Sequence, residues 1–150
     1  RGIPQFFYGT ELAMTSPKER NDGRIRADLP GGWEGDKVDV FQNINLSPLQ
    51  SEMREYVKKL LNWRKNATAI HDGKLIHFAP EDGIYSYFRF NEKEKYFVVL
   101  NKNDKEASLS LERYQGMLPN KPSFEDVLDG SHFQNEVRIP AKGFRILKVK

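Results

Sequence analysis

Four residues in one stretch of the chain have side chains suited to contacting a sugar: Arg24, Arg26, Asp28 and Trp33. Guanidinium and carboxylate groups are planar hydrogen-bonding groups, and an indole ring offers a flat apolar face. Together they could hold a ligand rich in hydroxyl groups. The same residues also permit a structural arrangement, in which Arg26 and Asp28 form an ion pair and Trp33 packs beneath it. Both interpretations stay open at the level of the sequence.

Glu11 is a further candidate, because it directly follows an apolar segment that has the composition of a strand. It could hydrogen-bond a substrate or orient the groups that do so. We favour a local role, in which the carboxylate orients the loop or caps the chain from Leu12 onward.

The sequence predicts neither a metal site nor a cofactor. The acidic residues of the same stretch are numerous enough to suggest calcium, but their spacing does not match the twelve-residue EF-hand loop. The histidines are scattered without the spacing of metal ligands, and the chain has no cysteine. We expect a solvated acidic loop. The aspartates considered for calcium are Asp22, Asp28, Asp36 and Asp39, and the scattered histidines are His71, His77 and His132.

The segment from Ile3 to Tyr8 has the composition of a buried strand. Its bulky apolar residues do not alternate with polar ones, which is typical of a strand covered on both faces, as in a parallel sheet. Such a strand needs neighbours, and no residues precede it to supply them. We therefore expect that residue 1 is a cut inside a larger fold, and that the long polar loop from Met14 to Leu46 is functional or has lost its neighbours.

Composition excludes several classes of protein. In 150 residues, 38% are hydrophobic and 12% aromatic, which is enough for a real core. The net charge of +3 arises from interleaved acidic and basic residues, so no nucleic-acid-binding patch is indicated. No run approaches the ~20 apolar residues of a membrane span.

Ser47-Pro48-Leu49-Gln50 has the pattern of a capping box with proline at the first helical position. Apolar residues then recur at helical spacing up to Leu61, so we predict an amphipathic helix of about 17 residues that ends near Lys65-Asn66.

From Leu75 onward the pattern changes to short strands bounded by turn residues. We predict a hairpin between Ile84–Phe90 and Tyr96–Leu100, and an antiparallel β-sandwich overall, so the fold class is mainly β. The tyrosines of the hairpin, Tyr85, Tyr87 and Tyr96, could form a sugar-binding platform or could simply pair across the sheet. The other predicted strands are Leu75–Phe78, Ala107–Leu111, Phe124–Leu128, Glu136–Ile139 and Phe144–Val149.

Three stretches resemble the α-amylase superfamily, glycoside hydrolase family 13. Residues 2–11 (GIPQFFYGTE) look like the eighth strand of its (β/α)8 barrel. Residues 24–36 (RIRADLPGGWEGD) look like the following loop in neopullulanase- and cyclomaltodextrinase-like members, and residues 60–65 (LLNWRK) are similar to the last barrel helix. The remainder resembles the C-terminal β-sandwich called domain C.

This resemblance implies that residues 1–66 are a remnant of the catalytic barrel and that residues 67–150 form the C-terminal sandwich. It implies a parent enzyme that hydrolyses α-glucosidic bonds of maltodextrin, pullulan or cyclodextrin by a retaining mechanism. The family's catalytic carboxylates match no position here, so no catalytic residue is assigned and the chain alone is predicted to be inactive. The resemblance also favours a periplasmic or extracellular location.

The expected partner is an α-glucan oligosaccharide, bound by the parent enzyme. A different interpretation is a non-catalytic carbohydrate-binding or interaction module, whose binding would depend on Trp33 or the sandwich tyrosines. Because the segment 1–46 would have lost its sheet neighbours, we also expect it to be poorly packed or to be buried in an exchanged homodimer.

Overall fold

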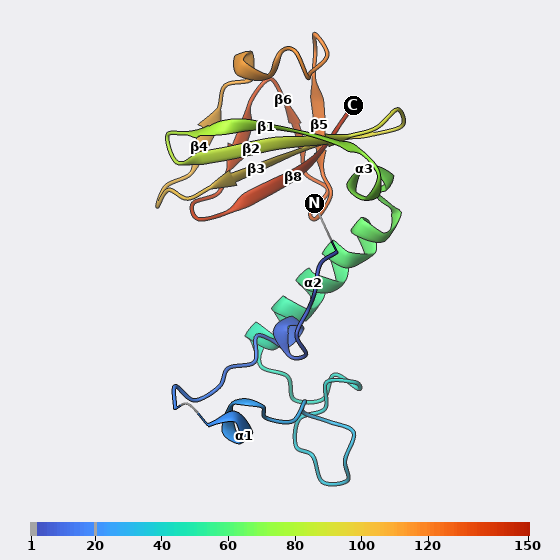
Figure 1. Ribbon diagram of the computed structural model, residues 1–150, viewed down its shortest axis with the longest axis vertical. Coiled ribbons are helices and arrows are strands. Elements are labelled where there is room, and N and C mark those ends of the chain that lie inside the picture. The colour runs from blue at the N-terminus through green and yellow to red at the C-terminus, as the bar shows by residue number, and fades with distance from the viewer. Residues whose placement is uncertain (1–2, 20) are drawn as a thin grey trace. The chain divides into compact units, whose positions relative to one another are not determined.

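The computed structural model describes residues 3–19 and 21–150 (Figure 1). They form two compact units, Arg1–Leu60 and Leu61–Lys150, which are treated separately below. Among the described residues, none of the helices has the length and hydropathy needed to cross a membrane.

The first unit contains little regular structure. Its elements are a 3-10 turn η1 (Thr10–Leu12), a one-turn helix α1 (Asp22–Ile25) and the first part of helix α2 (Pro48–Asn66). Between α1 and α2 the chain makes one isolated antiparallel bridge, in which Asp39 pairs with Ile44. Among the residues of this unit that the structure describes before α2, two side chains are well buried, Leu12 and Val40.

The strand predicted at residues 3–8 is not formed in this chain. Its apolar side chains are exposed, which agrees with the expectation that this segment is poorly packed without its sheet neighbours. Ile3 is 97% exposed and Phe7 is 65% exposed. A strand is stabilised by hydrogen bonds to a neighbouring strand, and no strand of either sheet in the described residues pairs with this segment. The part of the prediction that concerns Arg1 and Gly2 lies outside the described residues.

Helix α2 begins with the predicted capping box. The backbone N–H of Ser47 donates to Gln50 Oε1 at 2.9 Å, and the backbone N–H of Gln50 donates to Ser47 Oγ at 3.3 Å. The helix has 19 residues and is therefore about 28 Å long. Its apolar face is only partly covered, because Val57 is buried whereas Leu49 and Leu61 are exposed.

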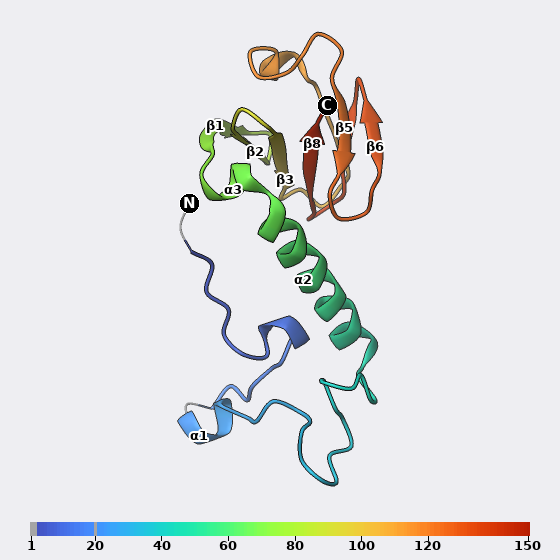
Figure 2. The same ribbon diagram turned by 90° about the vertical axis from the view of Figure 1, so that its right-hand side faces the viewer.

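The second unit is an antiparallel β-sandwich, which confirms the predicted fold class (Figures 1 and 2). Its larger sheet has the strand order β1-β2-β3-β8-β5-β6, and β4 pairs with β7 in a second sheet. The predicted hairpin is β2–β3, with Phe88 opposite Phe97. The strands are β1 (Lys74–Glu81), β2 (Ile84–Phe90), β3 (Lys95–Asn101), β4 (Ala107–Leu109), β5 (Ser123–Asp126), β6 (His132–Gln134), β7 (Val137–Ile139) and β8 (Phe144–Val149).

The core lies between the two sheets. Phe88 and Phe97 stack with ring centroids 4.3 Å apart, and Val137 and Ile139 of the smaller sheet belong to the same buried cluster. Tyr114, in the 3-10 turn η2 (Glu112–Tyr114), closes the cluster, and its hydroxyl lies 2.9 Å from Ser86 Oγ. Each fully buried side chain of this kind stabilises the fold by about 1.5–3 kcal/mol.

A short helix α3 (Thr68–His71) precedes β1 and packs against the larger sheet through Ala69 and Tyr96. Arg89 of β2 is buried and donates from Nε to the carbonyl of Ala69 at 3.1 Å and from Nη2 to that of Ile70 at 2.7 Å. Carbonyls at a helix C-terminus carry partial negative charge, so the arginine satisfies them and fixes α3 on the sheet.

Candidate functional site

Arg24 and Arg26 lie on and directly after helix α1. The helix forms because Asn21, its N-cap, accepts hydrogen bonds from the backbone N–H groups of Gly23 and Arg24. Arg24 pairs with Glu19 at 2.7 Å, and Arg26 pairs with Asp22 at 3.2 Å. Both pairs are largely exposed, so each contributes little to stability and both guanidinium groups remain accessible to a ligand.

The structural arrangement considered for this stretch is wrong. Arg26 pairs with Asp22 instead of Asp28, and Trp33 is 77% exposed instead of packed beneath an ion pair. The backbone N–H of Trp33 donates to Asp36 Oδ2 at 3.2 Å, which holds the turn that presents the indole. An indole exposed to this extent is available to stack on an apolar or sugar face.

Glu11 lies within η1, next to the buried side chain of Leu12. The N-cap of this turn is Gly9, and no side chain caps it, so the capping role favoured from the sequence is not formed. Gly9 has a φ of 83°, a backbone conformation that L side chains rarely adopt, and a Cβ at this position would overlap the side chain of Met14. The turn therefore requires glycine at position 9.

A small hollow of about 170 Å³ connects this turn to the loop. Its lining includes Tyr8, Gly9 and Met14 on one side and Ile25 and Ala27 on the other. The Tyr8 hydroxyl donates to the carbonyl of Ala27 at 3.1 Å. None of the five predicted site residues is among the described lining residues, so the structure does not gather them around this hollow.

Three of the four aspartates considered for calcium have other partners. Asp22 pairs with Arg26, Asp36 accepts from the Trp33 N–H, and Asp39 Oδ1 accepts from the N–H groups of Phe41 and Gln42. In the part of the chain that the structure describes, no three His, Asp or Glu side chains come together as a metal site would require.

The three sandwich tyrosines do not form one platform. Tyr85 and Tyr87 lie side by side on β2, with ring centroids 5.8 Å apart. Tyr96 is 3% exposed and packs edge-on against Trp63. Burial raises the pKa of Tyr96 to about 12, together with the hydrogen bond that its hydroxyl donates to Glu94. Tyr96 is therefore a buried packing residue.

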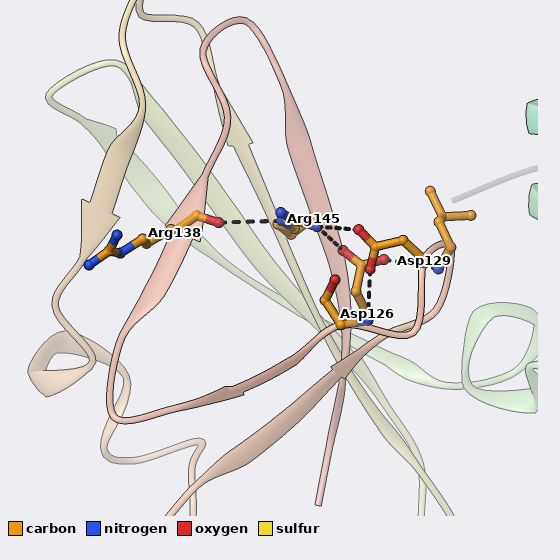
Figure 3. A network of polar contacts seen from close by, with 6 residues as sticks. Asp126, Asp129, Arg138 and Arg145 are labelled. Carbon is orange, nitrogen blue, oxygen red and sulfur yellow. Dashed lines mark hydrogen bonds and ion pairs between the residues drawn. The ribbon is translucent and has the colours of Figure 1, made fainter.

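An ionic cluster inside the second unit was not predicted from the sequence (Figure 3). Arg145 Nη1 lies 3.1 Å from Asp126 Oδ2 and 2.7 Å from Asp129 Oδ2, and its Nε donates to the carbonyl of Arg138. The guanidinium also lies over the ring of Phe133, 5.1 Å from its centroid. The cluster links β8, β5 and β7, and hence both sheets.

The environment of Asp129 lowers its pKa. Burial acts in the opposite direction, but hydrogen bonds from Ser131 and Arg145 outweigh it. Both carboxylates of the cluster are therefore held by one guanidinium, which suits a structural role better than proton transfer. Only chain folding reveals this cluster, because its members are 3 to 19 positions apart and no motif joins them.

Comparison with known proteins finds a family of domains that the sandwich resembles. Residues 75–148 match the sequence model of the cyclo-malto-dextrinase C-terminal domain. These 74 residues are similar to this family of domains. The match confirms the predicted resemblance to the C-terminal portion of α-amylase-family proteins.

Solved structures share the fold. An α-amylase from Geobacillus thermoleovorans, complexed with acarbose, superposes with a TM-score of 0.72 at 18% identity, over 99% of this chain and 30% of its own. An Anoxybacillus α-amylase superposes with a TM-score of 0.63 at 21% identity, over 95% of this chain and 28% of its own. AmyP in complex with maltose superposes with a TM-score of 0.61 at 14% identity, over 71% of this chain and 22% of its own. The chain thus spans less than a third of each of these proteins.

The cyclo-malto-dextrinase C-terminal domain match begins at residue 75 and leaves out the loop candidates. The fold likeness to the Geobacillus protein extends over nearly the whole chain, but at 18% identity it concerns the fold alone. The substrate-contacting roles of Glu11, Arg24, Arg26, Asp28 and Trp33 therefore stay predictions.

Proposed function

We propose that this chain is the C-terminal part of a glycosidase that hydrolyses α-glucosidic bonds of maltodextrin-, pullulan- or cyclodextrin-type glucans with retention of configuration. The observation that carries the proposal is the match of residues 75–148 to the cyclo-malto-dextrinase C-terminal domain. Solved structures of the same fold include proteins complexed with maltose and acarbose. Residues 1–66 would then be the last strand, loop and helix of a catalytic barrel.

The proposed chemistry assigns the reacting groups to other parts of the protein. A retaining glycosidase needs two carboxyl groups about 5–5.5 Å apart, one as nucleophile and one as general acid and base. The acidic side chains gathered within the sandwich, Asp126 and Asp129, are both held by Arg145. The chain would contribute a supporting domain and a loop beside the substrate.

In this proposal the loop contacts the sugar through Trp33 and the two arginines. Trp33 is 77% exposed, and neither arginine is buried by its ion pair. The indole would stack on a glucose ring, while Arg24, Arg26 and Asp28 would hydrogen-bond its hydroxyls. Glu11 would orient the loop from the 3-10 turn.

Three measurements test the proposal. The purified 150-residue chain, incubated with maltohexaose or pullulan, should release no reducing sugar, and turnover by this chain would contradict it. The whole gene product should hydrolyse maltohexaose and release the α-anomer first, as NMR would show. In that protein, Trp33→Ala should lower kcat/KM by about tenfold or more, with the exposed Phe41→Ala as a matched control.

A non-catalytic carbohydrate-binding module is the second candidate, favoured by the exposed indole of Trp33. It predicts glucan binding by a gene product that never hydrolyses the bond. Hydrolysis by the whole gene product would exclude it.

A further inference from the structure

A hollow of about 540 Å³ lies in the second unit, away from the loop candidates. The connection between β4 and β5 forms most of it, and Asn135, between β6 and β7, completes its wall. This connection is drawn in orange in Figures 1 and 2 and extends beyond the ends of the strands in both views. The volume is within the range of ligand pockets, about 300–1,000 Å³.

The connection that lines the hollow is fixed by a buried side chain and by hydrogen bonds. Tyr114, which is 2% exposed, lies in the same connection, and its carbonyl accepts from the N–H groups of Met117 and Leu118. Lys95 Nζ donates to the carbonyl of Met117 at 2.6 Å. Because the connection is anchored at these points, a ligand would not have to order it first.

The polar lining is uncharged except for one carboxylate. Gln115, Asn120 and Asn135 make no side-chain hydrogen bonds within the part of the chain that the structure describes, so their amides can donate and accept toward a ligand. Glu112 adds an acceptor, and no lysine or arginine is among the described lining residues. Leu118 and Pro119 supply apolar surface between these groups.

This combination selects a neutral ligand with many hydroxyl groups and apolar C–H faces. An anion would be repelled by Glu112 and would find no lysine or arginine among the lining residues that the structure describes. We infer that the hollow lined by Gln115, Asn120, Asn135 and Glu112 is a second binding site for α-linked gluco-oligosaccharide. The choice of an α-glucan as the oligosaccharide rests on the proposed function.

A second hollow of the sandwich, of about 520 Å³, lacks this free hydrogen-bonding capacity. Its amide, Asn91, donates from Nδ2 to Thr68 and Asp72 and accepts at Oδ1 from the N–H groups of Lys93 and Glu94. Because the Asn91 amide already has these partners, the first hollow is the better candidate.

The test is an NMR titration of the ¹⁵N-labelled 150-residue chain with maltotetraose. The side-chain NH₂ signals of Gln115, Asn120 and Asn135 should shift and saturate, with a Kd on the order of 1 mM. The double variant Gln115→Ala/Asn120→Ala should bind at least about tenfold more weakly. Asn62→Ala, which removes an exposed amide on α2, should bind as the unchanged chain does, and cellotetraose should bind more weakly than maltotetraose.

Four results would overturn the inference. The first three are no saturable shift, shifts centred elsewhere such as at Trp33, and equal binding by the double variant whose spectrum shows it to be folded. The fourth is a peptide that occupies the hollow when maltotetraose does not. If the whole gene product hydrolyses maltohexaose while the chain fails to bind at this hollow, the inference fails and the proposed function stands. Saturable binding at this hollow, combined with a whole gene product that does not hydrolyse maltohexaose, would leave the inference in place and remove the proposed activity.

Discussion

At the scale of single residues, Arg145 has the strongest structural consequence. Its guanidinium holds Asp126, whose side chain is 3% exposed, together with Asp129 on the following turn. A buried carboxylate that loses its cation is left without compensation for its lost hydration, which is strongly destabilising. The fold therefore depends on Arg145 because this side chain compensates the charge of the two aspartates.

Arg145→Met should lower the free energy of unfolding by about 3 kcal/mol, as measured by urea denaturation. The matched control is Arg138→Met, which removes an exposed pair with Glu136 and should change stability by less than about 1 kcal/mol. Equal effects of the two variants would contradict the structural role of the cluster.

The same cluster predicts an acid dependence with a definite sign. The pKa of Asp129 in the folded chain lies below its ordinary value of 3.8. Its contribution to stability is therefore complete above pH 3.8 and is lost as the pH falls through the lower folded value. Arg145→Met should reduce this acid loss, because the folded pKa then moves back toward its ordinary value.

At the scale of elements, side-chain hydrogen bonds hold the first residues of α2 and α3, from nearby in one case and from a distance in the other. Helix α2 starts at a reciprocal pair of bonds between Ser47 and Gln50. Helix α3 is held from a distance, because Glu94 Oε1 accepts from the Ala69 N–H and from the Thr68 hydroxyl. The bonds that start α2 lie within four residues, whereas the bond between Ala69 and Glu94 that holds α3 joins positions 25 apart.

Ser47→Ala should destabilise α2 by about 1 kcal/mol, because one backbone N–H at its first turn loses its partner. Circular dichroism during thermal unfolding would show the loss of helix. Ser51→Ala, inside the same helix, should be neutral or slightly stabilising, since alanine has the higher helix propensity. A shift of the same sign and size in both variants would exclude the capping role.

Glu94→Ala should release α3 from the sheet and cost about 2 kcal/mol, because the carboxylate accepts three hydrogen bonds from Thr68, Ala69 and Tyr96. Hydrogen exchange at Ala69 and Ile70 should accelerate. Glu92→Ala, two residues earlier and exposed, is the control and should leave this exchange unchanged.

At the scale of the whole molecule, the two units differ in how well they cover their apolar residues. The sandwich buries eight residues in one cluster. The first unit leaves Ile3, Phe7, Trp33 and Phe41 more than 60% exposed. Exposed apolar side chains in such numbers are typical of a surface that another part of a protein, or another copy, covers.

We therefore expect the isolated chain to self-associate through residues 3–8 and to form an exchanged dimer. Light scattering should show a mass that rises with concentration, and Phe6→Ser/Phe7→Ser should restore the monomer. Leu75→Ser/Ile76→Ser, which changes exposed apolar residues on β1, should not. A chain that stays monomeric at every concentration would contradict this expectation.

The sequence alone determined what depends on neighbouring residues. The capping box of α2, the hairpin of β2 and β3, and the sandwich pattern could be predicted, because turn residues and alternation act over a few positions. Strand β6 and the 3-10 turns were missed, since three-residue elements carry too little pattern.

Only the tertiary structure decided the features that join distant positions. The Arg145 cluster, the burial of Tyr96 and the pairing of Arg26 with Asp22 depend on which side chains the fold brings together. The segment 3–8 shows the same limit in reverse. Its composition is that of a buried strand, but a strand also needs a neighbour to accept and donate its backbone hydrogen bonds, and composition alone does not specify that neighbour.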